Sequence, residues 1–328
     1  ALADAQLEFA DPVFLENLDE RQTEASVVSD LHGNLVAVWT SQTPIINSEN
    51  IGTDRDVLSA RSTDGGMTWS DPVVVNSDAA TDTIDDDAVN AQIATDGEGT
   101  FIAAWLSNRI EGYGEGVSAS VSTDAGATWS PIIALDDPSQ RVNAVANTVG
   151  IAYGGGGVWV AAWLRELTEF SFEYEMFFAR SMDNGMTWSA PERIAETELA
   201  RDLSIAGTIP GIFVITFGTN ADINGTSGTD LDIYAVTSTI SAQSWSFPNV
   251  VNSNASTEET GDEAPYIRTD GNGAWVCLWN SFDDNVYAST SFNNGASWSQ
   301  QVQVNADMTG SHTQPAVHAL GNGNWYAT

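Results

Sequence analysis

Ser62-Thr63-Asp64-Gly65-Gly66-Met67-Thr68-Trp69 is a stretch that the chain repeats. Two close copies lie at Ser122–Trp129 and Ser181–Trp188. A weaker copy at Ser291–Trp298 has Asn in place of Asp. A decayed copy at Ser238–Trp245 keeps only the first Ser, a late hydroxyl and the Trp. In chain order, the five Trp residues are spaced by 60, 59, 57 and 53 residues. A period of this size indicates a repeat architecture.

The repeated stretch has the composition of a tight turn with an anchor behind it. The Asp can accept hydrogen bonds from the backbone of its own turn, and the Gly supplies a conformation that other residues resist. The Ser and Thr hydroxyls can tie the two limbs together. We expect each Trp to be buried between neighbouring sheets. The predicted structural residues are Asp64, Trp69, Asp124, Trp129, Asp183, Trp188, Asn293 and Trp298.

The pattern S-x-D-x-G-x-T-W resembles the Asp-box, or bacterial neuraminidase repeat, of the sialidase superfamily. Its five copies span Ser62 to Trp298, which is most of the chain. The resemblance implies a β-propeller whose boxes lie on the outer rim, on the face away from the catalytic pocket. Asp-boxes also occur in propellers that are not enzymes, so the resemblance implies little about activity.

A second repeated phrase defines the unit of the fold. A Gly is followed six residues later by an aromatic residue at Gly33…Trp39, Gly99…Trp105, Gly157…Trp163, Gly211…Phe217 and Gly273…Trp279. With a β-rich run before it and a box after it, each phrase predicts four strands, which make one propeller blade. The sequence therefore predicts an all-β fold with six four-stranded antiparallel blades.

The first residues complete the predicted count of blades. Phe9 stands 60 residues before Trp69, in the same local pattern, so residues 1–17 are expected to supply the outer strand of a sixth blade. Its inner strands would come from residues 314–328. We thus expect one propeller domain over residues 1–328, closed by strands from both ends, which removes an open sheet edge.

Composition restricts the partners of this chain. It has 45 acidic and 10 basic residues, a net charge of −35, and all its basic residues are Arg. Such a surface disfavours nucleic acid and anionic membranes. The single cysteine, Cys277, excludes an intrachain disulfide, and no apolar run approaches a membrane span. We expect a secreted, extracellular or periplasmic protein whose partner is a glycan or an extracellular protein, although the charge alone could serve solubility.

Candidate ligand-binding residues lie where the repeat is irregular. Successive turns of a blade lie at alternate ends of its sheet. The long connections after each second strand and between blades are therefore expected at the end opposite the boxes. Because variable loops usually carry function, we expect ligands to bind at that end. All twelve Trp residues have a position in the repeat, and none remains for a sugar platform on a loop. Tyr174 belongs to the aromatic run 170–174, which could also be an ordinary strand. The candidates are Arg21, Arg55, Arg165 and Tyr174.

The sialidase resemblance implies three Arg residues that bind the substrate carboxylate, a Tyr paired with Glu as the nucleophile, and an Asp as the acid/base catalyst. Where the first Arg is expected, the chain reads Thr23-Glu24-Ala25, and between Asp202 and Thr328 the only Arg is Arg268. No Arg triad is recognisable. The first hypothesis is therefore a glycan- or protein-binding or structural module. The alternative is a glycoside hydrolase with a divergent carboxylate site, for which the candidates are Asp54, Asp56, Asp87, Asp262 and Glu263.

One acidic loop suggests a metal. The stretch Asp222–Asp232 offers carboxylate and amide oxygens among glycines, as calcium prefers. The candidate ligands are Asp222, Asn224, Asp230 and Asp232. A solvated acidic loop without an ion is the alternative. No organic cofactor is expected, because neither a phosphate-binding loop nor a zinc motif is visible.

Overall fold

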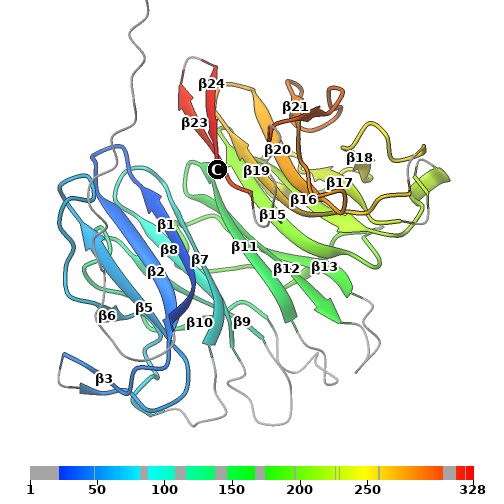
Figure 1. Cartoon of the computed structure of the whole chain (residues 1–328). Coiled ribbons are helices and arrows are strands. Elements are labelled where there is room, and N and C mark those ends of the chain that lie inside the picture. Colours follow the sequence, from blue (N-terminus) through cyan, green and yellow to red (C-terminus); the bar gives the residue numbers. More distant parts are fainter. Residues whose placement is uncertain are drawn as a thin grey trace, which may run out of the picture.

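The chain folds almost entirely into β-strands, arranged as a series of small antiparallel sheets (Figure 1). The computed structural model describes residues 22–47, 49–81, 88–107, 116–136, 146–166, 174–195, 197–225, 227–228, 230–257, 259–305, 315–321 and 323–328. Among these residues are five four-stranded sheets, which we number as blades one to five in chain order. Blade one contains β1 (Gln22–Ser29), β2 (Leu35–Ser41), β5 (Asp56–Ser62) and β6 (Val73–Val74), and blade two contains β7 (Ala88–Thr95), β8 (Phe101–Ser107), β9 (Gly116–Ser122) and β10 (Ile133–Ala134). Blade three contains β11 (Ala146–Gly155), β12 (Val158–Glu166), β13 (Tyr174–Ser181) and β14 (Glu192–Arg193), and blade four contains β15 (Arg201–Thr208), β16 (Ile212–Thr219), β17 (Asp232–Thr237) and β18 (Asn249–Val250). Blade five contains β19 (Asp262–Thr269), β20 (Trp275–Ser281), β21 (Val286–Ser291) and β22 (Val302–Gln303).

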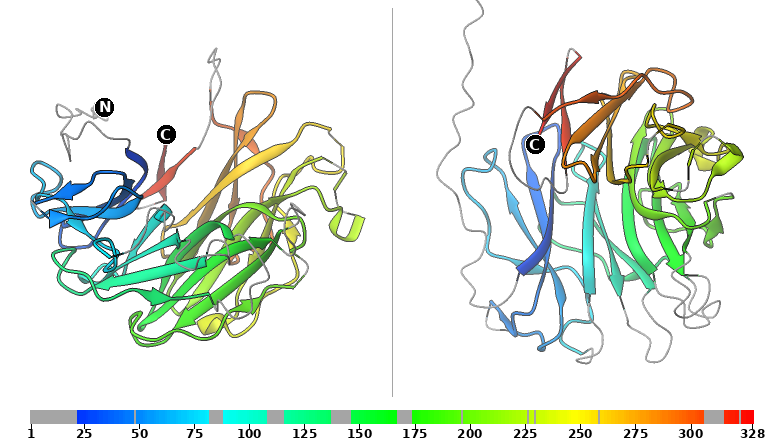
Figure 2. Two further views of the ribbon diagram at one scale, coloured as in Figure 1. Left: turned by 90° about the horizontal axis from the view of Figure 1, so that it is seen from below. Right: turned by 45° about the vertical axis from the view of Figure 1, so that its right-hand side comes forward.

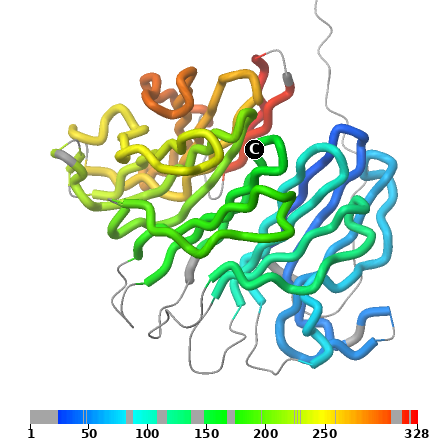
Figure 3. The backbone as a smooth tube through the Cα atoms, turned by 180° about the vertical axis from the view of Figure 1, so that it is seen from behind, coloured from blue at the N-terminus to red at the C-terminus, as the bar shows by residue number. Residues whose placement is uncertain are grey.

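The first strands of the blades lie side by side round the middle of the molecule. β1 contacts β7, β7 contacts β11, β11 contacts β15 and β15 contacts β19, while the later strands of each blade extend outward (Figure 2). Seen from behind, blade three lies between blades one and two on one side and blades four and five on the other (Figure 3). This arrangement confirms the predicted all-β propeller.

The end of the chain forms a smaller sheet. β23 (Val317–Gly321) and β24 (Asn324–Ala327) pair with each other and pack against blade five. Residues 1–21 lie outside the described residues, and with them Phe9 and the strand expected from residues 1–17. The six-blade count, the sharing of the last blade between the two ends and the single domain over residues 1–328 therefore remain predictions.

The hydrophobic core consists of layers between neighbouring blades. Alternate residues of a strand point to opposite faces of its sheet, so each second strand contributes to two layers. In β2, Val36 and Val38 pack towards blade two, whereas Trp39 packs on the other side, beside Ile46 of the small hairpin formed by β3 (Ile45–Ile46) and β4 (Glu49–Asn50). Four of these layers join neighbouring blades, so blades two, three and four are each stabilised from both sides.

The Asp-boxes form the turns that the sequence predicts. In the first box, Ser62 Oγ donates to Asp64 Oδ1 at 2.7 Å, and Asp64 accepts from the Thr68 amide at 2.9 Å and the Thr68 hydroxyl at 2.6 Å. The Gly66 amide donates to Ser62 Oγ at 2.8 Å. The same bonds recur in the boxes that begin at Ser122 and Ser181. The box is thus a closed network of hydrogen bonds within one turn.

The burial predicted for the box Trp residues needs a correction. Trp69, Trp129, Trp188, Trp245 and Trp298 pack at the edges of the layers between blades, but all five are only half-buried. The fully buried Trp residues belong to the second strands instead: Trp105, Trp159, Trp163, Trp275 and Trp279. The box lies at the end of a blade, where the layer is open to solvent on one side. Its Trp closes the end of the layer rather than filling the centre.

Asp64→Asn is expected to make the protein less sensitive to acid. Hydrogen bonds from Thr68 lower the pKa of Asp64 from its ordinary 3.8 to about 2. A lowered pKa contributes stability that is present above pH 3.8 and is lost as the pH falls towards 2. Blade five shows that Asn can replace Asp, because Asn293 Oδ1 accepts from Ser291 and Ser297 at 2.9 Å each.

Thermal unfolding between pH 7 and pH 2 measures this effect. The Asn variant should match the native protein near neutrality and lose less stability in acid, while Asp64→Ala should be destabilised at both ends of the range. Parallel pH curves for the native protein and the Asn variant would contradict the role assigned to Asp64.

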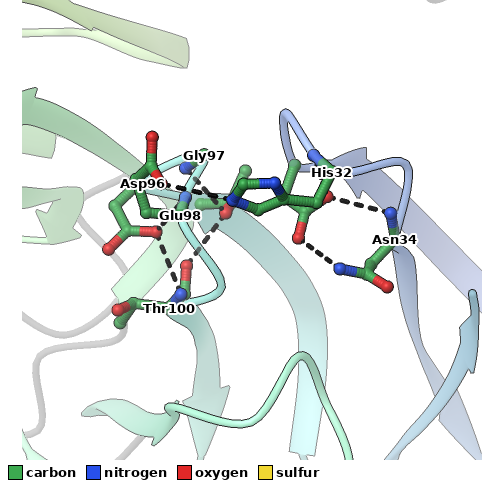
Figure 4. A network of polar contacts seen from close by, with 8 residues as sticks. His32, Asn34, Asp96, Gly97, Glu98 and Thr100 are labelled. Carbon is green, nitrogen blue, oxygen red and sulfur yellow. Dashed lines mark hydrogen bonds and ion pairs between the residues drawn. The ribbon is translucent and has the colours of Figure 1, made fainter.

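The two ends of the blades differ, and we call them the box face and the loop face. The box face carries the boxes and the turns between first and second strands. In blade two, for example, the Ala125 amide of the box donates a hydrogen bond of 3.2 Å to the carbonyl of Gly99, which lies in the turn between β7 and β8. Figure 4 shows two such turns, which join blades one and two through a hydrogen bond of 2.9 Å from Leu31 N to Gly97 O and a contact of 3.2 Å between His32 and Glu98. The loop face is the opposite end, with the described connections that follow second strands, such as the hairpin of β3 and β4. The fold therefore assigns the regular turns to one face and the variable segments to the other.

Candidate functional site

In each of the five described blades, the first strand is irregular near the loop face. The strand pairing shifts between residues 23 and 26, 89 and 92, 146 and 149, 201 and 203, and 263 and 266. In four blades a residue other than glycine has a positive φ at this bulge: Glu24 (60°), Asn90 (57°), Asp202 (43°) and Ala264 (51°). Positive φ is uncommon for such residues, and bulges redirect side chains and are frequent beside active sites. The bulges mark the loop-face end of the first strands as the place to look for function.

Two carboxylates lie at the bulges of blades four and five, on neighbouring first strands. Asp202 is exposed at the start of β15, and Glu263 is half-buried at the start of β19, the neighbouring first strand. Burial and, after it, the negative charge of Asp202 raise the pKa of Glu263 above its ordinary value. Glu263 was a candidate from the sequence, but Asp202 was not. Their sequence separation conceals the pair, since adjacent blades bring it together.

The remaining carboxylate candidates are more deeply buried. Asp54, Asp56 and Asp262 lie on the loop face and are 3%, 0% and 1% exposed. Asp56 accepts a hydrogen bond of 2.7 Å from Asn76 Nδ2, and Asn76 in turn accepts from the Val57 amide at 2.9 Å. This bond joins the start of a third strand to the end of a fourth, so Asp56 has a structural role. Asp87 lies outside the described residues.

The candidate ligand-binding residues are mostly engaged by the protein itself. Arg165, at the end of β12, forms an ion pair with the buried Asp136, and its guanidinium lies 4.1 Å from the centre of the Phe177 ring. Tyr174 begins β13 and packs, half-buried, against the layer between blades three and four. Arg55 is half-buried before β5. Arg21 and most of the aromatic run 170–174 lie outside the described residues.

The other arginines explain why no sialidase triad is recognisable. Arg61 and Arg180 donate to backbone carbonyls on the box face. Arg193 pairs with Glu175 and Glu198, and Arg268 lies over the Tyr266 ring. Arg55 also interacts within the protein, and Arg201 is exposed, next to Asp202. Among the described residues, three uncommitted arginines are therefore not available for one carboxylate.

The predicted calcium loop lies between β16 and β17. Asp232 begins β17, is fully buried, and accepts a hydrogen bond of 2.7 Å from Asn252 Nδ2. Burial and, to a lesser extent, the charges of Asp230 and Asp222 raise its pKa to about 6, against the opposing effect of hydrogen bonds from the Asn252 and Ser227 side chains. Asn224 lies in the short helix η2 (Ile223–Gly225), and its side chain is outside the described set. No group of three or more His, Cys, Asp or Glu side chains in the described part of the chain is arranged to hold a metal by itself.

The comparison with protein families identifies the repeat. The sequence model of the BNR repeat-like domain matches residues 33–251, which is more than half of the chain. The chain belongs to the BNR repeat-like domain family. In this BNR repeat-like protein four of the five boxes lie within the matched range, and the copy at Ser291–Trp298 lies beyond it. No match was found among curated protein sequences.

Solved structures of similar fold include several that carry glycosidase names. A Hadza microbial sialidase has a TM-score of 0.58 and 14% identity, over 90% of this chain and 60% of its own. The sialidase of Trypanosoma rangeli has a TM-score of 0.58 and 12% identity, over 94% and 52%. The α-L-arabinofuranosidase of Fusarium graminearum has a TM-score of 0.56 and 13% identity, over 92% and 86%. The BNR repeat-like protein thus spans about half to three fifths of the length of these two sialidases, and at such identities the likeness shows the fold alone.

No helix in the described residues is long and apolar enough to cross a membrane.

Proposed function

We propose that this BNR repeat-like protein is a secreted glycoside hydrolase that acts on neutral glycans through Asp202 and Glu263. The observation that carries the proposal is the position of these two side chains at the bulges of adjacent first strands, where burial and the charge of Asp202 raise the pKa of Glu263. Most glycosidases use two carboxyl groups, one of which must hold a proton near neutral pH. Burial beside a second carboxylate is a physical means of keeping that proton.

The two side chains receive different roles from their surroundings. Glu263, half-buried and next to a negative charge, acts as the acid that protonates the oxygen of the departing sugar. Asp202, exposed to solvent, acts as the carboxylate that activates water or attacks the sugar. The separation of the two carboxyl groups with substrate bound would decide between inversion and retention.

Neutral sugars suit this face better than sialic acid. Most of the described arginines are engaged by carboxylates, carbonyls or rings of the protein, and a net charge of −35 repels anionic substrates. The name of the Fusarium protein refers to α-L-arabinofuranosides, which are uncharged, and that chain matches over 86% of its length. Uncharged furanosides are accordingly the first substrate class to test.

A panel of fluorogenic glycosides tests the proposal. The panel should contain neutral furanosides and pyranosides together with a sialoside, at pH 4 to 8, with the full chain. Turnover of a neutral glycoside and none of the sialoside is expected. Binding on a glycan array without any turnover would contradict the hydrolase and favour the glycan-binding module that the sequence alone suggests.

A further inference from the structure

Phe282 is an exposed aromatic residue beside the proposed acid. It follows β20 on the loop face, and 61% of its surface is open to solvent. Its amide donates a hydrogen bond of 2.9 Å to the carbonyl of Gly261, which lies two residues before Glu263. Two residues of extended chain span about 7 Å. A glycan with one sugar unit at Glu263 can therefore reach the Phe282 ring with the next unit.

The repeat does not require an aromatic residue at this position. Phe282 stands three residues after Trp279, the aromatic residue of the second-strand phrase in blade five. The other four described blades have polar residues at the same place: Gln42, Asn108, Glu166 and Asn220. An exposed ring also forgoes the stabilisation that burial gives to an apolar side chain. The fold thus accepts a polar residue here, and the exposed ring needs another explanation.

Gly261 leaves the space in which the ring lies. A Cβ atom at residue 261 would meet Phe282 Cε2 at 2.9 Å and Cδ2 at 3.0 Å, and Leu231 Cβ at 3.4 Å. One edge of the ring therefore rests against the link between blades four and five, while most of the residue faces solvent. This contact holds the ring beside the start of β19.

The turn that carries Phe282 is held by its own hydrogen bonds. The Ser281 amide donates to the Asn285 carbonyl at 2.9 Å. The Asp283 carboxylate accepts from the Asn285 amide at 3.0 Å and from the Tyr287 hydroxyl at 2.9 Å. A ligand that binds to a turn already ordered in this way costs little further conformational entropy.

We propose that Phe282 is a platform on which one sugar unit of a neutral glycan stacks, next to the unit cleaved at Glu263. Ligand sites combine aromatic surface with a few polar groups, and the apolar face of a sugar ring matches the face of a Phe ring. Asp283 and Asp284 are exposed beside the ring, and their charge disfavours an anionic ligand. The inference rests on the proposed function, to which it adds an oligosaccharide, rather than a single sugar, as the substrate class.

Binding of oligosaccharides to Phe282→Gln tests the platform. Gln is the residue that blade one has at this place, and Phe282 is exposed, so the fold should persist. The full native chain and the variant are titrated in a calorimeter with linear oligosaccharides of arabinan, xylan and cellulose. The variant should bind the preferred oligosaccharide about tenfold or more weakly, because loss of an anchoring aromatic side chain removes a large part of the binding energy.

Phe292→Gln is the matched control for this loss. It makes the same substitution at a residue that is 78% exposed in the fifth box, on the box face of the same blade. Its affinity should equal that of the native protein. Gly261→Ala keeps the Phe282 side chain but displaces its ring, so it should also weaken binding.

The outcomes separate this inference from the hydrolase proposal. Native affinity in Phe282→Gln, or a native protein that binds none of these oligosaccharides, would overturn the platform. Binding that depends on Phe282 without any hydrolysis would support the platform and contradict the hydrolase. Hydrolysis of an oligosaccharide that Phe282→Gln binds with native affinity would contradict the platform alone.

Discussion

Glu263→Gln lowers kcat on a neutral glycoside by about 10²–10⁴-fold, the usual contribution of a general acid, and leaves KM nearly unchanged. Gln has the shape of Glu but cannot deliver a proton to the departing sugar. Glu263 is half-buried at the start of β19, and none of the hydrogen bonds and ion pairs found among the described residues requires its charge, so the protein should fold normally.

Glu192→Gln is the matched control for this loss, since it removes the same charge from an exposed position of a fourth strand. Its kcat should equal that of the native protein. Near-native turnover by Glu263→Gln, measured on a substrate that the native protein hydrolyses, would exclude Glu263 as the acid.

Gly185→Ala should cost about 2–4 kcal/mol of unfolding free energy through crowding and backbone strain. Gly185 lies in the third box with a φ of +81°, and a Cβ atom there would meet Ile102 Cδ1 of blade two at 2.3 Å and Val121 Cγ2 at 3.1 Å. Ile102 is fully buried in the layer between the two blades, so it has little room to move.

Gly66→Ala supplies the matched comparison, because Gly66 holds the same place in the first box. Its φ is +91°, but a Cβ atom there meets only Leu35 Cδ2 at 3.9 Å. The substitution should cost only the strain, about 1–2 kcal/mol. Urea unfolding of both variants measures the difference, which reports the packing of a box against the preceding blade. Equal losses would mean that the boxes do not contribute to contact between blades.

The fold could be predicted because the sequence repeats its structural residues at fixed positions. Asp64, Asp124 and Asp183 make the same hydrogen bonds in three blades, and Asn293 reproduces most of them. The half-burial of the box Trp residues could not be predicted in the same way. It depends on how far a layer extends beyond the end of its sheet, which the repeat pattern does not encode.

The site was predicted only in part, for physical reasons. Glu263 could be selected because it begins a first strand, but Asp202 becomes significant only through its positive φ and the contact between β15 and β19. Neither the bulge nor the contact has a signature in composition. Arg165 was expected to face a ligand, but it pairs with Asp136, a partner that only the arrangement of neighbouring blades reveals.

The pKa of the Glu263 carboxyl group is the measurement that tests the central claim most directly. Carbon NMR of the side-chain carboxyl gives this pKa in the native protein and in Asp202→Asn. Burial and the charge of Asp202 should place the native value above the ordinary 4.5, and removing that charge should lower it. An ordinary value that Asp202→Asn does not change would contradict the account, because the two carboxyl groups would then not form a pair.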